Sequence, residues 1–429
     1  MKRIKGGSFV GGAGIYLFSN ILNAVIPFIL LPILTRYLSP EEYGEVAMFQ
    51  TLLGALGAFV GMTFVGAANR KFYDSNLEKN ELAEFIGSCV QLISISAVVV
   101  FSVFFLFRSN FSEWLSLKPS YVLFAVVVSF CTVIIALRLG QWQVQKKAID
   151  YGALQISQSL LNMLLSLLLV VALLKGAAGR IDAQIVTGLV FVLIAFILLK
   201  KDGLLKVTVW RKEYLAEALR FGVPLMPHLA GGFLLNSVDR FVINDELGLA
   251  EAGIYMVAVQ LTAAVGIVFD AINKAYVPWL FERLKADVHK EKQKIVKLTY
   301  LWFLCIILGV VLAFFIGPWL VVLVAGEKYA QAGEVIGWLA LGQGFQGMYL
   351  MVTNYIFFSK KTGLLSVASI SSGFINLLLL IVFVRILGLQ GAAIAFALSM
   401  GIRFLLTWLI AHKRHPMPWF NFISKQEIL

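Results

Sequence analysis

The sequence predicts an all-α polytopic membrane protein, and its composition and the spacing of its apolar stretches both lead there. Hydrophobic residues make up 60% of the 429 residues and charged residues only 14%, and the mean hydropathy is +0.86. A soluble core of this size cannot bury so much apolar surface. The apolar residues are also gathered into stretches long enough to cross a bilayer.

Taking about 20 apolar residues for each span, we expect about 12 transmembrane helices. The expected spans are 11–35, 43–67, 82–107, 120–143, 151–174, 182–200, 220–242, 252–279, 297–324, 333–358, 363–385 and 388–411. The connections between them are too short for a folded domain, which needs at least about 50 residues. The function is therefore expected within the membrane or at its surfaces.

An internal repeat divides the chain into two halves. The matched residues are Leu38, Glu42 and Gly44 with Leu247, Glu251 and Gly253 at an offset of 209 positions, and Ile156, Ser157 and Asn162 with Ile370, Ser371 and Asn376 at an offset of 214. We expect two six-helix bundles around a central cleft, related by a pseudo-twofold axis along the membrane normal. The expected divisions are an N-terminal bundle over 1–205, a basic cytoplasmic linker over 206–219 and a C-terminal bundle over 220–429.

The distribution of Lys and Arg predicts the orientation. With the N-terminus inside, 25 of the 36 basic residues fall at the inner ends of the spans and 8 at the outer ends. Because short cytoplasmic loops carry the excess of basic residues, both termini are expected in the cytoplasm. The bilayer and the topology account for the positive charge, so nucleic-acid binding is not expected. The three cysteines lack paired or metal-ligand spacing, and we expect neither disulfides nor a metal site.

Local signals predict where helices start and bend. Ser39, Pro40 and Glu42 form a capping-box pattern with proline in the first helical position, so a helix should begin sharply at residue 40. Prolines in the first span of each half suggest either bends or tolerated kinks. These prolines are Pro27, Pro32, Pro224 and Pro227.

Charged residues inside the expected spans are the first candidates for function, because an ionised group in hydrocarbon is costly unless it meets a partner. Arg138 and Arg403 have no acid within one helical turn. Each should therefore face a partner helix, a ligand or a wet cavity. Asp270 and Lys274 are four residues apart on one helix face, which suits either a structural ion pair or a functional site.

The span expected over 220–242 carries an unusual set of polar residues. Asp239 and Arg240 stand side by side near its outer end. His228 lies 11 positions before Asp239, about 20° from eclipsed on a helix, so both can face one surface. By topology the charged pair suits a gate or coupling element between the bundles as well as a substrate ligand, and a lone histidine is more often a satisfied polar residue.

Asparagines mark further candidate faces. Asn20 and Asn23 share one face of the first span, while Asn236 and Asn273 lie in the seventh and eighth. These residues either line a polar cleft or join helices through hydrogen bonds worth about 0.6 kcal/mol each.

Three groups of residues along the chain form an ordered pattern. They are Pro27, Pro32, Arg36 and the run Leu38-Ser39-Pro40-Glu41-Glu42-Tyr43-Gly44, then Asp239-Arg240 with Leu247-Gly248 and Ala252-Gly253-Ile254-Tyr255, and finally Gly388-Leu389-Gln390-Gly391-Ala392-Ala393. The pattern resembles the O-antigen flippases, the polysaccharide-transporter branch of the multidrug, oligosaccharidyl-lipid and polysaccharide exporter superfamily. The resemblance covers essentially the whole chain.

The resemblance implies a transporter of the bacterial inner (plasma) membrane, with no enzymatic activity and no cofactor. Its implied cargo is an undecaprenyl-diphosphate-linked oligosaccharide, such as the O-antigen unit of lipopolysaccharide, moved from the cytoplasmic to the periplasmic leaflet by alternating access. Membrane lipids and other polysaccharide assembly proteins are the further partners that it implies.

A diphosphate crosses hydrocarbon only if its charge is met, and arginine supplies planar paired donors for it. The residues expected to line a cationic cleft are Arg36, Arg138, Lys274 and Arg403. Coupling to H⁺ or Na⁺, or gating, is expected from Asp239, Arg240, Asp270 and His228, and polar lining from Asn20, Asn23, Asn236 and Asn273.

Two other functions stay open. A multidrug and toxin antiporter of the same superfamily would share the architecture, although a cavity for cations should favour acids, and unpaired bases dominate here. A polytopic membrane enzyme of polysaccharide assembly would usually show a sizeable outer loop or a surface cluster of His and Asp, and neither is visible in the sequence.

Overall fold

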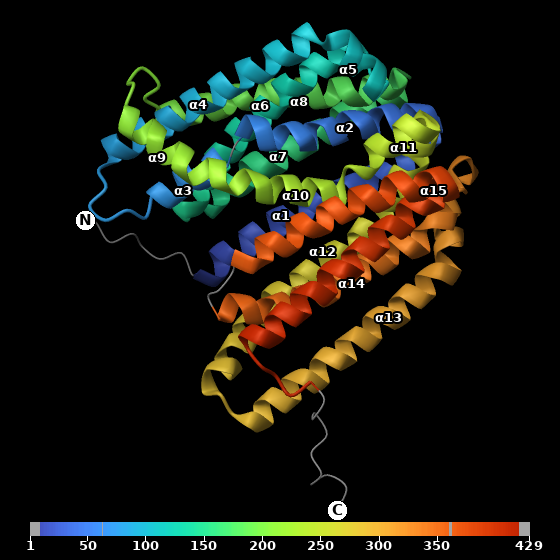
Figure 1. Cartoon of the computed structure of the whole chain (residues 1–429). Helices are drawn as coiled ribbons and strands as arrows, with labels where there is room; N and C mark the ends of the chain where they lie inside the picture. Colours follow the sequence, from blue (N-terminus) through green and yellow to red (C-terminus); the bar gives the residue numbers. More distant parts are fainter. Residues whose placement is uncertain (1–8, 62, 360–362, 420–429) are drawn as a thin grey trace, which may run out of the picture. The chain divides into compact units, whose positions relative to one another are not determined.

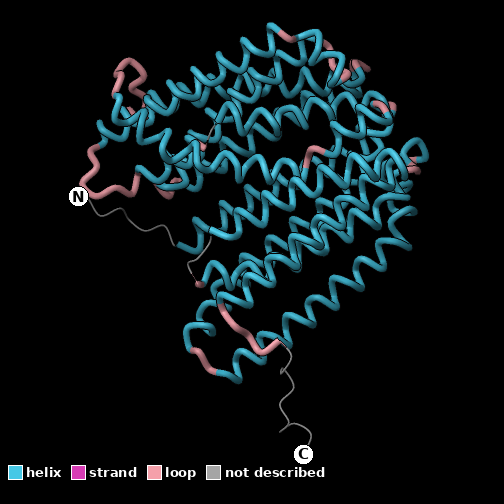
Figure 2. Tube along the Cα trace, in the orientation of Figure 1, coloured by secondary structure: helices cyan, strands magenta, loops and turns pink. Residues whose placement is uncertain are grey.

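The computed structural model describes residues 9–61, 63–359 and 363–419, which are helical almost throughout and contain no strand (Figure 2). The elements are α1 Phe9–Tyr37, α2 Pro40–Gly61, α3 Phe64–Lys71, α4 Lys79–Leu106, α5 Arg108–Leu115, α6 Pro119–Val144, α7 Ala148–Ser166, the π-helical η1 Leu167–Ala172, α8 Gly176–Lys201, α9 Lys212–Gly222, the 3₁₀ turn η2 Val223–Leu225, α10 Met226–Asn236, α11 Asp239–Leu247, α12 Leu249–Ala286, α13 His289–Ala325, the 3₁₀ turn η3 Glu327–Tyr329, α14 Ala332–Phe358 and α15 Gly363–Arg414.

Within the described residues, 11 helical segments are long and apolar enough to cross a membrane. The last of them lies in α15, which contains both of the final expected spans. Two helices meet within α15 at a kink, where Gly388 has φ 59° and ψ −138°. Glycine adopts this backbone conformation without the steric cost that a side chain would add. The protein is therefore a multi-span, all-α membrane protein, as the sequence predicts.

The chain divides into two compact units, residues 1–230 and 231–429. In the first unit α6 packs against α2, α4 and α8, while α1 packs along α7 (Figure 1). The α6 helix is apolar on nearly all sides and is largely buried, as expected for a helix surrounded by others. In the second unit α14 has this central place, in contact with α12, α13 and α15.

The boundary between the units differs from the expected one. The segment expected as a linker, 206–219, contains the start of α9, which packs on α3 and α4. Leu215, Ala218 and Gly222 form the buried stripe of this helix. Because one face of α9 is apolar, it docks on the first unit instead of staying in solution. The second compact unit begins at residue 231, whereas the C-terminal bundle was expected from residue 220.

The seventh expected span, 220–242, is broken into α9, η2, α10 and α11. The first break falls at Pro224, which lies in η2, because proline cannot donate the helical hydrogen bond. Pro27 and Pro32 have no such effect and lie inside the continuous helix α1. Proline thus breaks the helix at residue 224 and is tolerated inside α1.

The capping box before α2 is confirmed. The Ser39 amide donates to Glu42 Oε2 at 2.9 Å, and the Glu42 amide donates to Ser39 Oγ at 3.2 Å. The Glu42 side chain also lies against the start of α8, where a Cβ on Gly176 would come within 1.9 Å of Glu42 Oε1. Gly176 has φ +59°, so glycine is required there for both its conformation and the close approach.

Candidate functional site

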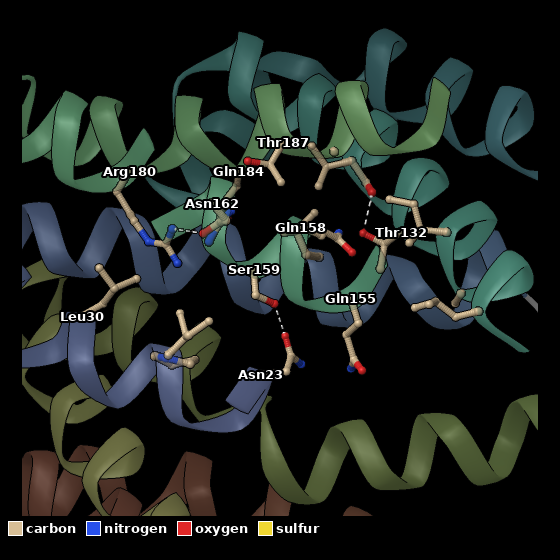
Figure 3. A pocket seen from close by; sticks show the side chains of 18 residues that line it. Asn23, Leu30, Thr132, Gln155, Gln158, Ser159, Asn162, Arg180, Gln184 and Thr187 are labelled. Atoms are coloured by element: carbon tan, nitrogen blue, oxygen red, sulfur yellow. Dashed lines mark hydrogen bonds between the residues drawn. The ribbon is translucent and has the colours of Figure 1, made fainter. Parts of the chain in front are cut away.

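A polar cavity of about 380 Å³ lies within the first unit (Figure 3). Residues from α1, α2, α6, α7 and α8 line it. Its polar lining residues are Asn23, Thr132, Gln155, Gln158, Ser159, Asn162, Arg180, Gln184 and Thr187. The described lining contains one cation, Arg180, and no carboxylate. The cavity therefore combines amides and hydroxyls with a single positive charge.

Helix α7 supplies more of the polar wall than any other helix, because polar residues recur along it at helical spacing. Gln155, Ser159 and Asn162 line the cavity, and Ser166 continues the stripe one turn further. Steps of four, three and four residues keep these side chains on one face of the helix. The sequence-based expectations did not include this stripe, although its spacing was the signal for it.

Arg180, near the start of α8, is the charged residue of the cavity and is only 8% exposed. Its Nη1 donates to Asn162 Oδ1 at 2.5 Å and to Ser166 Oγ at 2.6 Å. Its Nε has no hydrogen-bond partner, and none of the described carboxylates forms an ion pair with it. Because only neutral groups bind this guanidinium, the protein does not offset its positive charge. It can therefore bind an anionic ligand through paired N–H donors.

Other buried polar atoms in the lining also lack a protein partner. They are Gln155 Oε1, Gln184 Oε1 and Thr187 Oγ1. Buried polar atoms are normally hydrogen-bonded, so each of these can serve a bound molecule. Figure 3 shows the side chains of Gln155, Gln184 and Thr187 around the same cavity as Arg180.

The structure places Asn23 in the cavity lining and Asn20 next to it. Asn20 Oδ1 accepts hydrogen bonds from Tyr151 Oη and Gln155 Nε2, each at 3.3 Å. Asn23 Oδ1 accepts one from the Ser159 hydroxyl. The two asparagines therefore join α1 to α7, and Asn23 also faces the cavity.

Arg138, expected in a cationic cleft, lies outside this cavity and has an acid partner. It is fully buried on α6, where it donates to Asp202 just beyond α8 and lies 3.9 Å from the Trp142 ring centre. Lys147 Nζ is 3.5 Å from the same carboxylate. Burial raises the pKa of Asp202, but Arg138 and Lys147 outweigh this and hold that pKa below its ordinary value. The sequence left a partner helix, a ligand or a wet cavity open for Arg138. The structure shows the first of these, because its partner Asp202 lies at the end of α8.

Arg403 is held in the second unit much as Arg180 is in the first. Its Nη1 donates to Gln346 Oε1 at 3.0 Å, and its Nη2 lies 3.5 Å from Ser369 Oγ. Its guanidinium carbon is 4.0 Å from the Tyr349 ring centre. Its Nε is buried without a partner, and no described carboxylate pairs with it. Arg180 in the first unit and Arg403 in the second are thus each bound by an amide and a hydroxyl.

Asp270 and Lys274 on α12 neutralise each other. Lys274 Nζ lies 2.6 Å from Asp270 Oδ2, and the two side chains are 69% and 52% exposed. Asn273, between them, accepts a hydrogen bond from Asn354 Nδ2 at 2.8 Å. Asp270 and Lys274 therefore form the ion pair that their spacing suggested.

Asp239 and Arg240 also form an ion pair, with 3.0 Å between Oδ1 and Nη1 and side chains only 5% and 7% exposed. The Asn236 carbonyl accepts from Arg240 Nη1, and Asn236 Nδ2 donates to the Gly232 carbonyl at 2.8 Å. The helix is interrupted between Asn236 and Asp239. The predicted alignment of His228 with Asp239 along one continuous helix is therefore wrong.

His228 and Arg36 complete the residues that the sequence singled out. His228 lies on α10 and Arg36 in the last turn of α1, and both are exposed. Neither lines the polar cavity of the first unit.

The helices define a multi-span membrane protein, and its first unit contains a polar cavity. The sequence profile of the polysaccharide biosynthesis protein family matches residues 9–284, more than half of the chain. The chain therefore belongs to the polysaccharide biosynthesis protein family.

Two relatives extend this comparison over most of the chain. An Lsg locus protein of Haemophilus influenzae is 27% identical over 369 residues, which cover 83% of this chain and 87% of the relative. A protein of Haloferax volcanii, named as a probable low-salt glycan biosynthesis flippase, is 22% identical over 412 residues, which cover 90% of this chain and 80% of the relative.

Solved structures show the same fold. The lipid II flippase MurJ in an inward closed conformation has a TM-score of 0.72 at 14% identity, with 94% of this chain and 87% of MurJ covered. An inward-facing multidrug resistance transporter of the MATE family, in the MOP superfamily, has a TM-score of 0.70 at 17% identity, with 93% and 94% covered. At these identities the likeness extends to the fold alone.

Proposed function

We propose that the chain is a flippase for a lipid-linked oligosaccharide, which it moves from the cytoplasmic to the outer leaflet by alternating access. The proposed carrier lipid is undecaprenyl diphosphate, and the sugar is a repeat unit of the O-antigen type. The observation that carries the proposal is the cavity, whose described lining contains Arg180 and no carboxylate. The family and the relative named as a flippase support transport of a polysaccharide precursor over catalysis.

The cavity suits the polar end of such a lipid. Arg180 offers charge-assisted hydrogen bonds to a phosphate, and the amides of Gln155, Gln158 and Gln184 match the donors and acceptors of sugar hydroxyls. A volume of about 380 Å³ lies within the usual range of small-molecule sites, about 300–1,000 Å³. The lipid chain would stay in the bilayer while this end is bound.

The same charge argues against an exporter of organic cations. Such a cargo needs an acid or an aromatic cage to offset its desolvation. The described lining of the cavity has neither, and Arg180 would repel a cation. Efflux of cationic drugs by the purified protein would reverse this preference.

The proposal includes a bacterial inner-membrane location with both termini in the cytoplasm, and coupling to H⁺ or Na⁺. Asp270 is the preferred coupling residue, because its side chain is 52% exposed and that of Asp239 only 5%. Flipping rates in vesicles with imposed gradients test this. We expect wild type to respond to one gradient and Asp270→Asn to lose the response; a wild type that is indifferent to both gradients removes the coupling.

The cavity is tested with purified protein in vesicles that contain a fluorescent lipid-linked oligosaccharide. Arg180→Gln should slow flipping at least about tenfold, since a hydrogen bond to a charged group is worth about 1.5–3 kcal/mol. The matched control is Arg108→Gln, which removes an exposed charge from α5 of the same unit. Flipping by Arg180→Gln at the wild-type rate, at equal amounts of protein, would contradict the proposal.

A further inference from the structure

A second hollow lies on the first unit, between the end of α3 and α9. It measures about 900 Å³, and its charged lining residues are Arg70, Lys212, Glu213, Glu217 and Arg220. Phe221, Pro224 and Leu225 supply an apolar part of its lining. None of these residues lines the polar cavity described above, so the hollow is a separate feature of the unit.

The free charge in this hollow is positive. Both oxygens of Glu217 are 3.0 Å from Lys71 Nζ, so the protein already neutralises this carboxylate. Arg70, Lys212 and Arg220 form no ion pair with a described carboxylate. Among the described lining residues, Glu213 is the one acid that no cation pairs with. The hollow therefore has three unpaired bases and one unpaired carboxylate.

Apolar surface lies directly beside these bases. The Arg70 guanidinium carbon is 5.8 Å from the Phe221 ring centre. Leu219, Val223 and Leu225 are 37%, 48% and 39% exposed. A basic and apolar face on a short amphipathic helix is typical of contact with the head-group region of a membrane.

The helix packing places the hollow near the inner ends of the spans. Tyr214 of α9 packs against Phe85, with ring centres 5.7 Å apart, and Arg211 Nε is 3.1 Å from Glu84 Oε2. Both partners lie in the second turn of α4, which starts at Lys79. With the proposed orientation, on which this inference rests, that end of α4 faces the cytoplasm.

We infer that the hollow binds the head group of an anionic glycerophospholipid of the cytoplasmic leaflet, such as phosphatidylglycerol. Arg70, Lys212 and Arg220 meet the phosphate, and the acyl chains run along Phe221 and Leu225. The lipid is a bound component of the α9 region and not the transported cargo. The site is distinct from the Arg180 cavity.

Native mass spectrometry of the full-length protein, purified in detergent with equal amounts of phosphatidylglycerol and phosphatidylcholine, tests the site. The test variant carries Arg70→Gln, Lys212→Gln and Arg220→Gln, and the matched control carries Lys285→Gln, Lys290→Gln and Lys413→Gln. The control removes the same charge from exposed positions outside the hollow. We expect wild type and control to retain phosphatidylglycerol selectively. The test variant should lose about tenfold in selectivity, because it lacks three exposed bases that favour an anionic head group over a zwitterionic one, and each exposed charge pair contributes only a few-fold.

A separate variant, Glu213→Gln, guards against a folding defect in the triple variant, because it should increase phosphatidylglycerol retention. Millimolar inorganic phosphate should not displace the lipid. Equal retention of the two lipids by wild type, unchanged selectivity in the test variant or full displacement by phosphate would overturn the inference. Flipping is not measured, so a failure of the proposed transport function would leave this result standing.

Discussion

Asp202→Asn tests whether Arg138 is stabilised by a structural ion pair. The substitution keeps the size of the side chain and removes the negative charge. Arg138 is fully buried, and its Nε and Nη1 have no hydrogen-bond partner. The Asp202 carboxylate and the Trp142 ring, 3.9 Å from the guanidinium carbon, therefore carry most of its stabilisation.

The magnitude follows from the burial of the two partners. Leaving a fully buried charge without its counter-ion costs about 3–5 kcal/mol. The Asp202 side chain is 28% exposed, so water screens part of the pair, and we expect a loss of about 2–3 kcal/mol. For a unit of this size, about 2–4 °C per kcal/mol gives a fall in the unfolding midpoint of about 4–12 °C.

Thermal unfolding of the purified protein near neutral pH measures this loss. The double variant with Arg138→Met should recover most of it, because a neutral pair of similar volume replaces the buried ion pair. Glu113→Gln, which removes an exposed acid from α5, should leave the midpoint unchanged. A midpoint for Asp202→Asn within error of wild type would refute the structural role.

The pH dependence of this effect has a defined sign. The pKa of Asp202 is held below its ordinary value of 3.8. A carboxylate with a lowered pKa contributes stability that is complete above its unfolded-state pKa and is lost as the pH falls through its folded-state pKa. The difference between wild type and Asp202→Asn should therefore stay constant from about pH 5 to 8 and shrink below about pH 4.

Two further predictions concern packing. Burial, and then the charge of Lys292, lower the pKa of His415 from 6.5. The stability that neutral His415 contributes should therefore be complete above pH 6.5 and decline on acidification. Unfolding midpoints measured from about pH 7 to 5 should show this decline in wild type and not in His415→Gln. A Cβ on Gly87 would come within 2.1 Å of the Lys206 carbonyl oxygen, whereas one on Gly57 meets nothing within 4 Å. Gly87→Ala should therefore lower the unfolding midpoint. Gly57→Ala should raise the midpoint, because alanine stabilises a helix by up to about 1 kcal/mol relative to glycine; the opposite order would contradict the packing of α4.

Much of the helical framework could be predicted, because it depends on local chemistry. The capping box at Ser39 and Glu42 placed the start of α2 at Pro40, where the structure has it. The helix break at Thr63 had no such local signal. The chain leaves the helix at Thr63, a non-glycine residue with φ 59°, and starts α3, although the apolar pattern runs on without a pause. Only packing around the chain can hold a threonine in this conformation.

The candidate site was predicted in part. The shared face of Asn20 and Asn23 was visible because helical spacing reports it. Arg180 lies just before the sixth expected span, 182–200, in a connection that the expected topology places outside the membrane. In the structure α8 begins at Gly176, against the side chain of Glu42. This early start, which depends on a contact with α2, brings Arg180 into the helix and the cavity.

The sequence by itself determined that the chain crosses a membrane, where most of its helices lie and which residues share a helix face. These properties depend on hydropathy and on spacing within one segment. Only the tertiary structure decided which charges are neutralised. Asp202, which neutralises Arg138, is 64 residues away in sequence, whereas Arg180 is bound by the neutral Asn162 and Ser166. Helical periodicity orients a side chain on its own helix, but the neighbour that it meets depends on how the helices pack.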